Sequence, residues 1–400
     1  MDFLLNPQQK QFQEAFSNFC QARIAPRSRE ADRTGIFPHQ NWEDLKQQEY
    51  FALFHDREQG GKGADGITLA IAIETLAKAC ASTAWIATIS TLLSGKIITN
   101  FGTPAHQKKW LLPIIKGEKI ACFSIVELRG SDRLDLRTHL VKTKDGYLLN
   151  GSKNKTTNIP GADVGIIYTN IADEQGNLKN EFAYAIVELK NQNIKQERIE
   201  TQGLRAMPWG RLTFENVWVP ESDVIILKNA NLEELLKTVE WGQFLIACCS
   251  LGIAEAAVLS AINYTKKSQI AGVPLIELQS VHRQLVDMKI EIKAARAMIW
   301  YVAGLKEKKQ SARDLVAIAK INATEMAVRI AQTAMNLHGG WGFSTEYDVE
   351  RLLRDSQGSL AGGLAADVLR ESITCSLFGI NQWQPESCNT DLIYGNIYVK

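Results

Sequence analysis

Hydrophobic and polar positions divide the chain into three regions with different periods. Residues 1–118 place apolar side chains at helical spacing, most clearly over 8–24 and 67–91. Residues 119–228 follow a period closer to two, with β-branched or aromatic runs bounded by glycine, asparagine and proline. From 229 to 382 the helical period returns. The pattern therefore predicts a mostly α-helical chain with a central β domain.

Within these regions the individual elements are predicted from the same signals. Strands are expected at residues 163–169, 182–189 and 212–219. Residues 146–151 finish in Asn-Gly and are expected to end a strand in a turn. Four long helices are expected near residues 231–269, 275–306, 311–338 and 361–379. Their short connections predict an antiparallel four-helix bundle, followed by a polar tail at 383–400.

Composition narrows the class of protein. The chain has 400 residues and is 45% hydrophobic. Its formal net charge of +1 produces no strong electrostatic potential that would attract nucleic acid or an anionic membrane. No uninterrupted apolar run reaches the roughly 18 residues of a membrane span, and residues 1–7 lack the features of a signal peptide. Seven cysteines and six histidines show no metal-binding spacing. We therefore expect a cytoplasmic protein without a metal site.

Several short motifs occur in a fixed order along the chain. They are Glu-Gln-Gly-Gly at 58–61, Phe-Ser-Ile-Val-Glu at 123–127, Gly-Ser-Asp at 130–132, Asn-Gly-Ser-Lys at 150–153, Thr-Thr-Asn at 156–158, Phe-Glu-Asn-Val-Trp-Val-Pro at 214–220, Leu-His-Gly-Gly-Trp-Gly-Phe at 337–343 and Arg-Asp at 354–355. In this order and spacing they resemble the acyl-CoA dehydrogenase family, from about residue 5 to 380. The resemblance implies an N-terminal helical domain, a small β-barrel domain and a C-terminal four-helix bundle.

The resemblance also implies an FAD cofactor and the residues that hold it. The cofactor-binding residues that it implies are Ile125, Gly130, Ser131, Thr157, Gln279, Asn336, Gly339 and Gly340. In the family, Thr157 would lie against the flavin ring, whereas Gly339 and Gly340 would let the cofactor of a neighbouring subunit approach the backbone. We therefore expect a homodimer or homotetramer with FAD at the subunit interface.

Other flavin contacts of the family are altered in this sequence. Ser268 stands where the family has an arginine that meets the pyrophosphate, and Ala271 stands where it has an aromatic residue. The aromatic that covers the flavin aligns with Lys155. The loss of an arginine–phosphate pair removes a strong charge-assisted contact, which Lys266 or Lys267 would replace only as a point charge. The sequence thus leaves open whether FAD binding is retained, reshaped or lost.

The family's catalytic carboxylate is also missing. Family members remove the substrate α-proton with a glutamate at one of two positions, which align here with Gly363 and Gly242. Asp367 follows Gly363 by four residues and is expected one helical turn along on the same face. Glu240 precedes Gly242 by two residues, so a helix would rotate it roughly 200° away. Asp367 and Glu240 are the two candidate bases.

Three functions are compatible with this sequence. The favoured one is an FAD-dependent dehydrogenase or oxidase that acts on an acyl thioester of CoA or of a carrier protein, in a specialised biosynthetic pathway. Its electrons would pass to a partner protein or to O2. The second is a flavin-dependent monooxygenase, which needs no α-proton base. The third is a member of the fold without FAD that has non-redox chemistry or a structural role.

Overall fold

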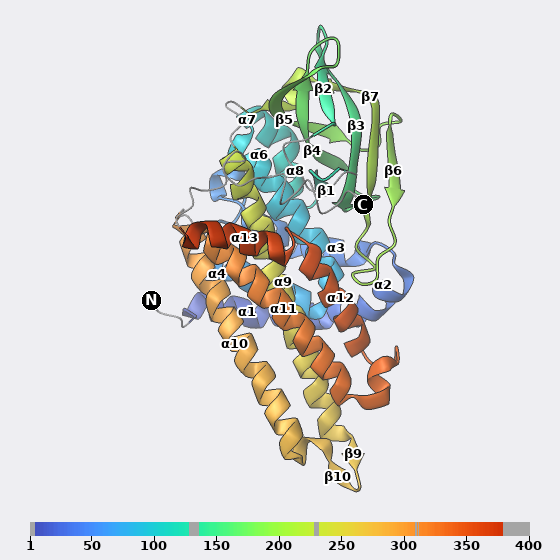
Figure 1. Cartoon of the computed structure of the whole chain (residues 1–400), viewed down its shortest axis with the longest axis vertical. Helices are drawn as coiled ribbons and strands as arrows, with labels where there is room; N and C mark the ends of the chain where they lie inside the picture. The colour runs from blue at the N-terminus through green and yellow to red at the C-terminus, as the bar shows by residue number, and fades with distance from the viewer. Residues whose placement is uncertain (1–4, 128–135, 228–231, 309, 311, 379–400) are drawn as a thin grey trace.

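The computed structural model describes residues 5–127, 136–227, 232–308, 310 and 312–378. The molecule is elongated, with the large β-sheet at one end and the far ends of the long helices, joined by a small β-hairpin, at the other (Figure 1). The N-terminal helices lie beside the middle of the molecule, between the sheet and the bundle. This arrangement confirms the predicted fold class, a mostly α-helical chain with a central β domain.

Short helices and tight helical turns build the N-terminal region. Its helices are α1 Pro7–Phe19, α2 Ser28–Thr34, α3 His39–Gln47, α4 Gly66–Ala79, α5 Ala81–Thr88, α6 Gly95–Phe101, α7 Pro104–His106 and α8 Leu112–Ile115. The turns are η1 Cys20–Ile24, η2 Ala25–Arg27, η3 Tyr50–Phe54, η4 Arg57–Gln59, η5 Ile89–Ser94 and η6 Gln107–Leu111. The single helix expected over 67–91 is in fact interrupted, because Cys80 has an extended backbone (φ −158°, ψ 104°). No glycine or proline marks this break, so apolar spacing did not predict it.

One eight-stranded sheet forms the middle region in the part of the chain that is described. Its strands are β1 Ala121–Ser124, β2 His139–Lys142, β3 Gly146–Thr157, β4 Val164–Ala172, β5 Leu178–Glu188, β6 Ile194–Arg198, β7 Trp209–Pro220 and β8 Val224–Ile226. The order is β6-β7-β3-β2-β4-β5-β8, with β1 paired to β4, and the turn η7 Glu221–Asp223 precedes β8.

Strands β4, β5 and β7 occur where strands were predicted, but the turn expected within 146–151 does not form. Strand β3 instead continues through Gly151, where its register against β7 shifts. The φ angle of Gly151 is +125°, and a Cβ there would lie 2.6 Å from the Cα of Thr138. Only glycine fits this bulge, which explains why an Asn-Gly pair occurs inside a strand.

The C-terminal region is a helical bundle with one more helix than the sequence predicted. Its helices are α9 Leu232–Lys267, α10 Gln279–Glu307, α11 Arg313–Leu337, α12 Val349–Ala361 and α13 Ala366–Leu377. The connections include the hairpin β9 Gln269–Ile270 and β10 Val273–Pro274, and the turns η8 Leu275–Glu277 and η9 Gly339–Phe343. Helix α12 packs against α9 and α11 and takes the fourth place in the bundle, whereas α13 crosses its end (Figure 1). The helix predicted at 361–379 therefore begins later, at Ala366, and is not the fourth bundle helix.

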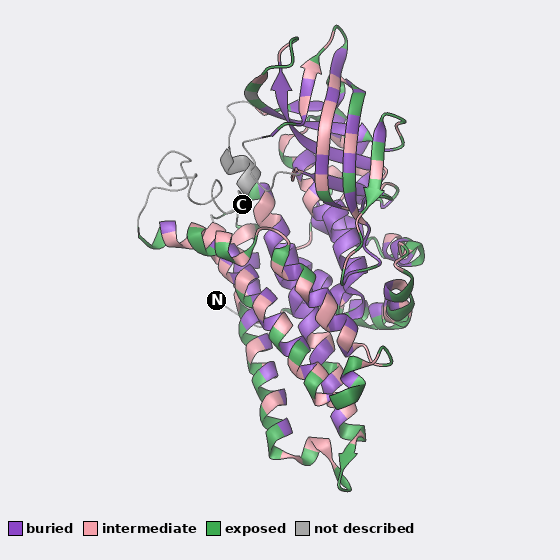
Figure 2. Ribbon diagram, turned by 45° about the vertical axis from the view of Figure 1, so that its right-hand side comes forward, coloured by how far each residue is buried: buried purple, intermediate pink, exposed green. Residues whose placement is uncertain are grey.

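Helix α9 lies at the centre of the molecule. Every residue from 242 to 254 is buried. Purple, the colour of buried residues, predominates where the helices meet at the centre of the molecule (Figure 2). The helix packs against α4, α5 and η5 of the N-terminal region and against α10, α11 and α12 of the bundle. By length and composition it could cross a membrane, but 72% of its most apolar window is buried within the chain. Its apolarity is therefore explained by its place in a core shared by two regions.

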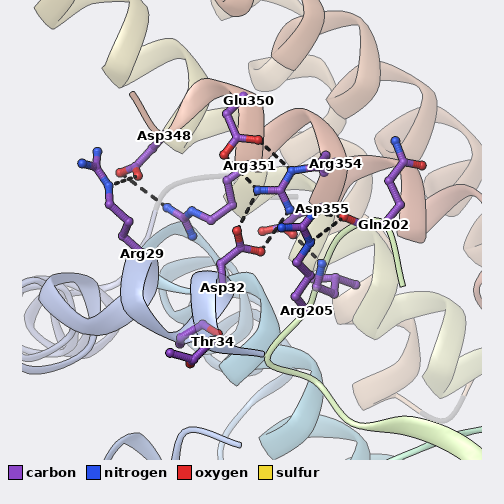
Figure 3. A network of polar contacts seen from close by, with 12 residues as sticks. Arg29, Asp32, Thr34, Gln202, Arg205, Asp348, Glu350, Arg351, Arg354 and Asp355 are labelled. Carbon is purple, nitrogen blue, oxygen red and sulfur yellow. Dashed lines mark hydrogen bonds and ion pairs between the residues drawn. The ribbon is translucent and has the colours of Figure 1, made fainter. Parts of the chain in front are cut away.

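Arg354 on α12 connects all three regions (Figure 3). Its guanidinium lies 2.7 Å from the carboxylate of Asp32 on α2 and 2.7 Å from that of Glu350 on α12. It also donates a 3.2 Å hydrogen bond to the carbonyl of Gln202, in the connection between β6 and β7. Burial opposes the charge on Arg354, but the bonds to Glu350 and Asp32 raise the pKa of this arginine above its ordinary value. The charged form is therefore held in place by all three regions.

The next residue, Asp355, is a buried carboxylate in the same network. Its Oδ1 accepts a 2.5 Å hydrogen bond from the backbone N–H of Leu204, which fixes the β6–β7 connection against α12. Burial raises the pKa of Asp355 from 3.8 to about 6, although the charge of Arg351 and the Leu204 N–H act in the opposite direction. Asp355 is thus a group whose charge opposes folding at neutral pH.

We expect Arg354→Met to lower the free energy of unfolding by about 3 kcal/mol, because it leaves two largely buried carboxylates without their cation. Arg33→Met is the matched control, since the Arg33–Glu30 pair is exposed and is expected to contribute nothing measurable. Denaturant unfolding of both variants checks this expectation. Equal midpoints for the two variants would contradict it.

The stability of the wild type relative to Asp355→Asn is expected to depend on pH. Between pH 4 and 6 the folded chain holds a proton on Asp355 that the unfolded chain has lost, so raising the pH through this window destabilises the wild type. The change should not exceed about 3 kcal/mol and should level off above pH 6. Unfolding midpoints of both proteins from pH 4.5 to 7.5 measure it, and parallel curves would argue against a raised pKa.

Candidate functional site

The two positions at which the resemblance expects a catalytic carboxylate lie side by side in the structure. Gly363 is in the connection between α12 and α13, and Gly242 is on α9. A Cβ on Gly363 would lie 2.8 Å from Cδ1 of Ile246 and 3.7 Å from the Cα of Gln243. Among the described residues outside its own helix, the side chain of Leu93 alone comes within 4 Å of a Cβ on Gly242, at 3.8 Å. Both positions therefore meet at the same part of α9.

A buried lysine fixes the connection that contains Gly363. Gly363 and Leu364 have φ angles of +61° and +83°, so the chain turns sharply between α12 and α13. The ammonium of Lys320 on α11 donates 2.9 Å hydrogen bonds to the carbonyls of Leu360 and Leu364, on either side of the turn. The Lys320 side chain is fully buried, and burial lowers its pKa from 10.5 to about 8. Sequence analysis did not single out this lysine, because its role depends on contacts across the bundle.

The described atoms nearest to the two glycines belong to apolar or aromatic side chains and to one amide. A Cβ on Gly362 would lie 2.8 Å from the Trp85 ring, and Ile246 and Leu93 complete the nearest neighbours. The amide is that of Gln243, which is 5% exposed. Gln243 was not among the predicted site residues. The sequence does distinguish it, because it is the one amide in the apolar stretch 241–249 of α9.

Asp367 does not occupy the position that the sequence predicted for it. Because α12 ends at Ala361 and α13 begins at Ala366, Gly363 and Asp367 do not share a helix, and the expected helical relation between them is wrong. The Asp367 side chain is 97% exposed and lies 3.2 Å from Arg370. Its carboxylate therefore points to solvent in the isolated chain.

Glu240 faces away from Gly242, as expected. Its carboxylate lies 3.3 Å from the ammonium of Lys306 on α10 and 3.7 Å from the guanidinium of Arg313 at the start of α11. Lys306 also lies over the ring of Trp241, with its ammonium 4.3 Å from the ring centroid. Two cations thus engage Glu240 on the side of α9 that faces α10 and α11.

Two of the predicted flavin-binding residues are brought together where β1 and β3 end. The hydroxyl groups of Ser124 and Thr156 lie 2.6 Å apart, which places Ile125 and Thr157 next to this contact. Thr156 is buried, whereas Thr157 is half-buried and its hydroxyl forms no hydrogen bond with the described residues. A partly exposed, unpaired hydroxyl is available to a ligand at this edge of the sheet.

A second buried lysine fixes the segment after β1. Lys153 donates a 3.0 Å hydrogen bond to the carbonyl of Ile125 and lies 2.9 Å from the carboxylate of Glu127. Burial lowers the pKa of Lys153 to about 8, although Glu127 acts to raise it. Gly130 and Ser131, which come next in the predicted set, lie outside the described residues.

The remaining predicted flavin residues lie elsewhere in the chain. Gln279 begins α10 beside the β9–β10 hairpin, at the end of the bundle away from the sheet (Figure 1). Asn336 lies at the end of α11, and Gly339 and Gly340 lie in η9. Like Gln279, these three residues are exposed. Apart from their chain neighbours, no atom of the described residues comes within 4 Å of a Cβ placed on Gly339 or Gly340. One chain therefore does not bring these residues to Thr157.

The altered positions are also accessible. Lys155 is exposed with φ +58°, two residues before Thr157 on β3. Ala271 and Gly272 have φ angles of +49° and +80° and form the turn of the β9–β10 hairpin, which Ser268 precedes. Nothing in these segments supplies the planar guanidinium or the aromatic ring that the resemblance leads one to expect.

Comparison with known families agrees with the motifs. Three family models match the chain in order: the acyl-CoA dehydrogenase N-terminal domain over residues 6–118, the middle domain over 122–217 and the C-terminal domain over 232–377. A probable acyl-CoA dehydrogenase of Bacillus subtilis, YngJ, is 30% identical over 359 residues, which covers 89% of this chain and 94% of the relative.

Solved structures give the same result. The butyryl-CoA dehydrogenase of Megasphaera elsdenii superposes with a TM-score of 0.89 at 29% identity, over 94% of this chain and all of the other. The prolyl acyl carrier protein oxidase AnaB superposes with a TM-score of 0.86 at 26% identity, again over 94% of this chain and all of the other. The two proteins differ in the handle that carries the acyl group.

We expect Asp367→Asn to change the rate of flavin reduction by an acyl thioester less than threefold, because its carboxylate is exposed. Glu240→Gln should lower the thermal midpoint, because it leaves Lys306 and Arg313 without their carboxylate. It should have little effect on the rate of flavin reduction. Stopped-flow reduction and thermal unfolding of both variants test this. Removal of a general base costs about 10²-fold or more, so a loss of that size in a stable variant would identify the base.

Proposed function

The chain belongs to the acyl-CoA dehydrogenase family, and on that premise we propose that it oxidises an acyl thioester carried by CoA or by a carrier protein. It is an oxidoreductase of this family, and its cofactor is FAD. The observation that supports the substrate class best is the coverage of all three domains by relatives that act on acyl thioesters. The similarity to a carrier protein oxidase supports a biosynthetic role with a carrier-bound substrate.

The residues present at the sheet edge fit a flavin. FAD supplies the acceptor for the hydride that leaves the substrate. Thr157 offers an unpaired, half-exposed hydroxyl there, and Lys153 holds the backbone of Ile125 beside it. Gly340 is exposed and has open space at its Cβ, as a backbone that closely approaches a cofactor requires. We assign the ring end of FAD to Thr157 and Ile125.

The other end of the cofactor would be held by a second subunit. Gln279, Asn336, Gly339 and Gly340 are exposed and lie away from Thr157 in one chain, so they serve FAD only across an interface. Exposed apolar side chains on the bundle support such an interface: Leu259, Val286, Ile290, Trp341 and Phe343. We propose a homodimer or homotetramer in which each FAD touches two chains.

The chain's own residues do not supply a carboxylate at the expected positions. Gly363 and Gly242 are next to apolar side chains and Gln243, Glu240 is engaged by two cations, and Asp367 is exposed. An acyl thioester bound here would therefore lose its α-proton to water or to a group of its own. The same observation favours a second candidate, a flavin-dependent monooxygenase, because that reaction needs no α-proton base.

Anaerobic reduction of the holoenzyme separates these functions. We expect purified protein to show the absorbance of oxidised flavin, and butyryl-CoA or a butyryl carrier protein to bleach it without NAD(P)H. Because none of the described carboxylates lies at either glycine, the reduction should be about 10²- to 10⁴-fold slower than in a relative with the glutamate. Bleaching by NADPH alone would favour the monooxygenase. A colourless protein that FAD does not restore would refute both.

A further inference from the structure

Gln243 is a buried amide with no partner among the residues that the structure describes. The residue is 5% exposed, and its side-chain oxygen and nitrogen form no hydrogen bond with any described residue. Neither of these two unpaired atoms is completely buried. The small accessible area of Gln243 therefore includes its amide. A buried amide without a partner is unfavourable, and most such groups in proteins are paired. The missing partner of Gln243 is therefore expected to come from outside the chain.

The position of this amide connects it to the reacting end of the substrate. Its Cγ lies 3.5 Å from where a Cβ of Gly363 would be, and Gly242 is its neighbour on α9. Under the proposed function, on which this inference rests, a side chain at either glycine would reach the α-carbon of the acyl group. An amide this close to Gly363 is then near carbon 2 of the bound acyl chain.

The charged groups nearby are already engaged. Lys320 donates to the carbonyls of Leu360 and Leu364, and Glu240 pairs with Lys306 and Arg313. The other neighbours of the glycines, Trp85, Leu93 and Ile246, turn carbon atoms toward them, although the indole N–H of Trp85 also has no hydrogen-bond partner among the described residues. Among the described side chains nearest Gly363, Gln243 is thus the one that can both donate and accept a hydrogen bond with a polar feature of the substrate.

We propose that Gln243 determines substrate specificity by hydrogen-bonding a hydroxyl or amine on carbon 2 of the acyl thioester. The natural substrate class would then be a 2-hydroxyacyl or 2-aminoacyl thioester rather than a plain fatty acyl thioester. An amide both donates and accepts, so it pairs with either substituent. An unsubstituted acyl chain would leave the buried amide unpaired, and sites of this kind discriminate strongly against substrates that lack the partner group.

Paired probes test this assignment in the FAD-loaded protein. Butyryl-phosphopantetheine and 2-hydroxybutyryl-phosphopantetheine differ only at carbon 2 and carry the arm that CoA and carrier proteins share. Perturbation of the flavin spectrum measures their dissociation constants. We expect the wild type to bind the 2-hydroxy probe at least about tenfold more tightly.

Gln243→Met keeps the length of the side chain and removes its hydrogen bonding, so it should abolish this preference mainly by weakening the 2-hydroxy probe. Gln175→Met, in the exposed turn between β4 and β5, is the control and should keep the preference. Gln243→Asn retains an amide on a side chain that is one methylene shorter, so it should keep part of the preference for the 2-hydroxy probe. It provides a second variant in case Gln243→Met does not fold.

Each result decides the question. A preference that is lost in Gln243→Met and kept in Gln175→Met supports the assignment. Equal affinity of the wild type for both probes, absence of binding by either, or a preference that survives in Gln243→Met overturns it. The proposed function stands or falls separately, on whether any acyl thioester reduces the flavin.

Discussion

The complete burial of the middle section of α9 is the constraint on which the rest of the structure depends. Helices of the N-terminal region and of the bundle both pack against its apolar middle section, residues 242–254. Because protein interiors are close-packed, neither region can move along α9 without opening voids. The section also carries Gly242, Gln243 and Ile246. The site is therefore built on the most firmly held element, and a fixed geometry for a bound acyl chain requires such support.

Helix α12 is fixed against its neighbours at two places, by different interactions. Within it, Arg354 and Asp355 bind Asp32 of the N-terminal region and the β6–β7 connection (Figure 3). At its end, Lys320 binds the carbonyls around Gly363. Buried charges contribute little net stability, but they are costly to leave unpaired and so favour one arrangement over its neighbours. The network thus specifies where the Gly363 turn lies relative to α9.

Periodicity and motif order were enough to predict the three regions and many of their elements, whereas contacts between distant elements were not predictable. The helices α9, α10 and α11 and the strands β4, β5 and β7 carry clear periods. The interruption at Cys80 carries no breaker residue, and Gly151 suggests a turn as readily as a bulge. Helix α12 was not predicted. The surroundings of Asp367, Lys320 and Gln243 include residues of other elements, so local spacing could not reveal them.

The two glycines that replace the family's glutamate are not equivalent. At Gly363 the backbone has φ +61° and Ile246 would lie 2.8 Å from a Cβ, so any side chain there brings strain and displacement. At Gly242 the backbone is helical, and a Cβ would meet only Leu93 at ordinary contact distances. The fold therefore favours glycine at the first position but would accept a larger residue at the second. A glycine that packing does not require leaves space beside Gln243, and a substituted acyl chain would occupy that space and pair with the amide.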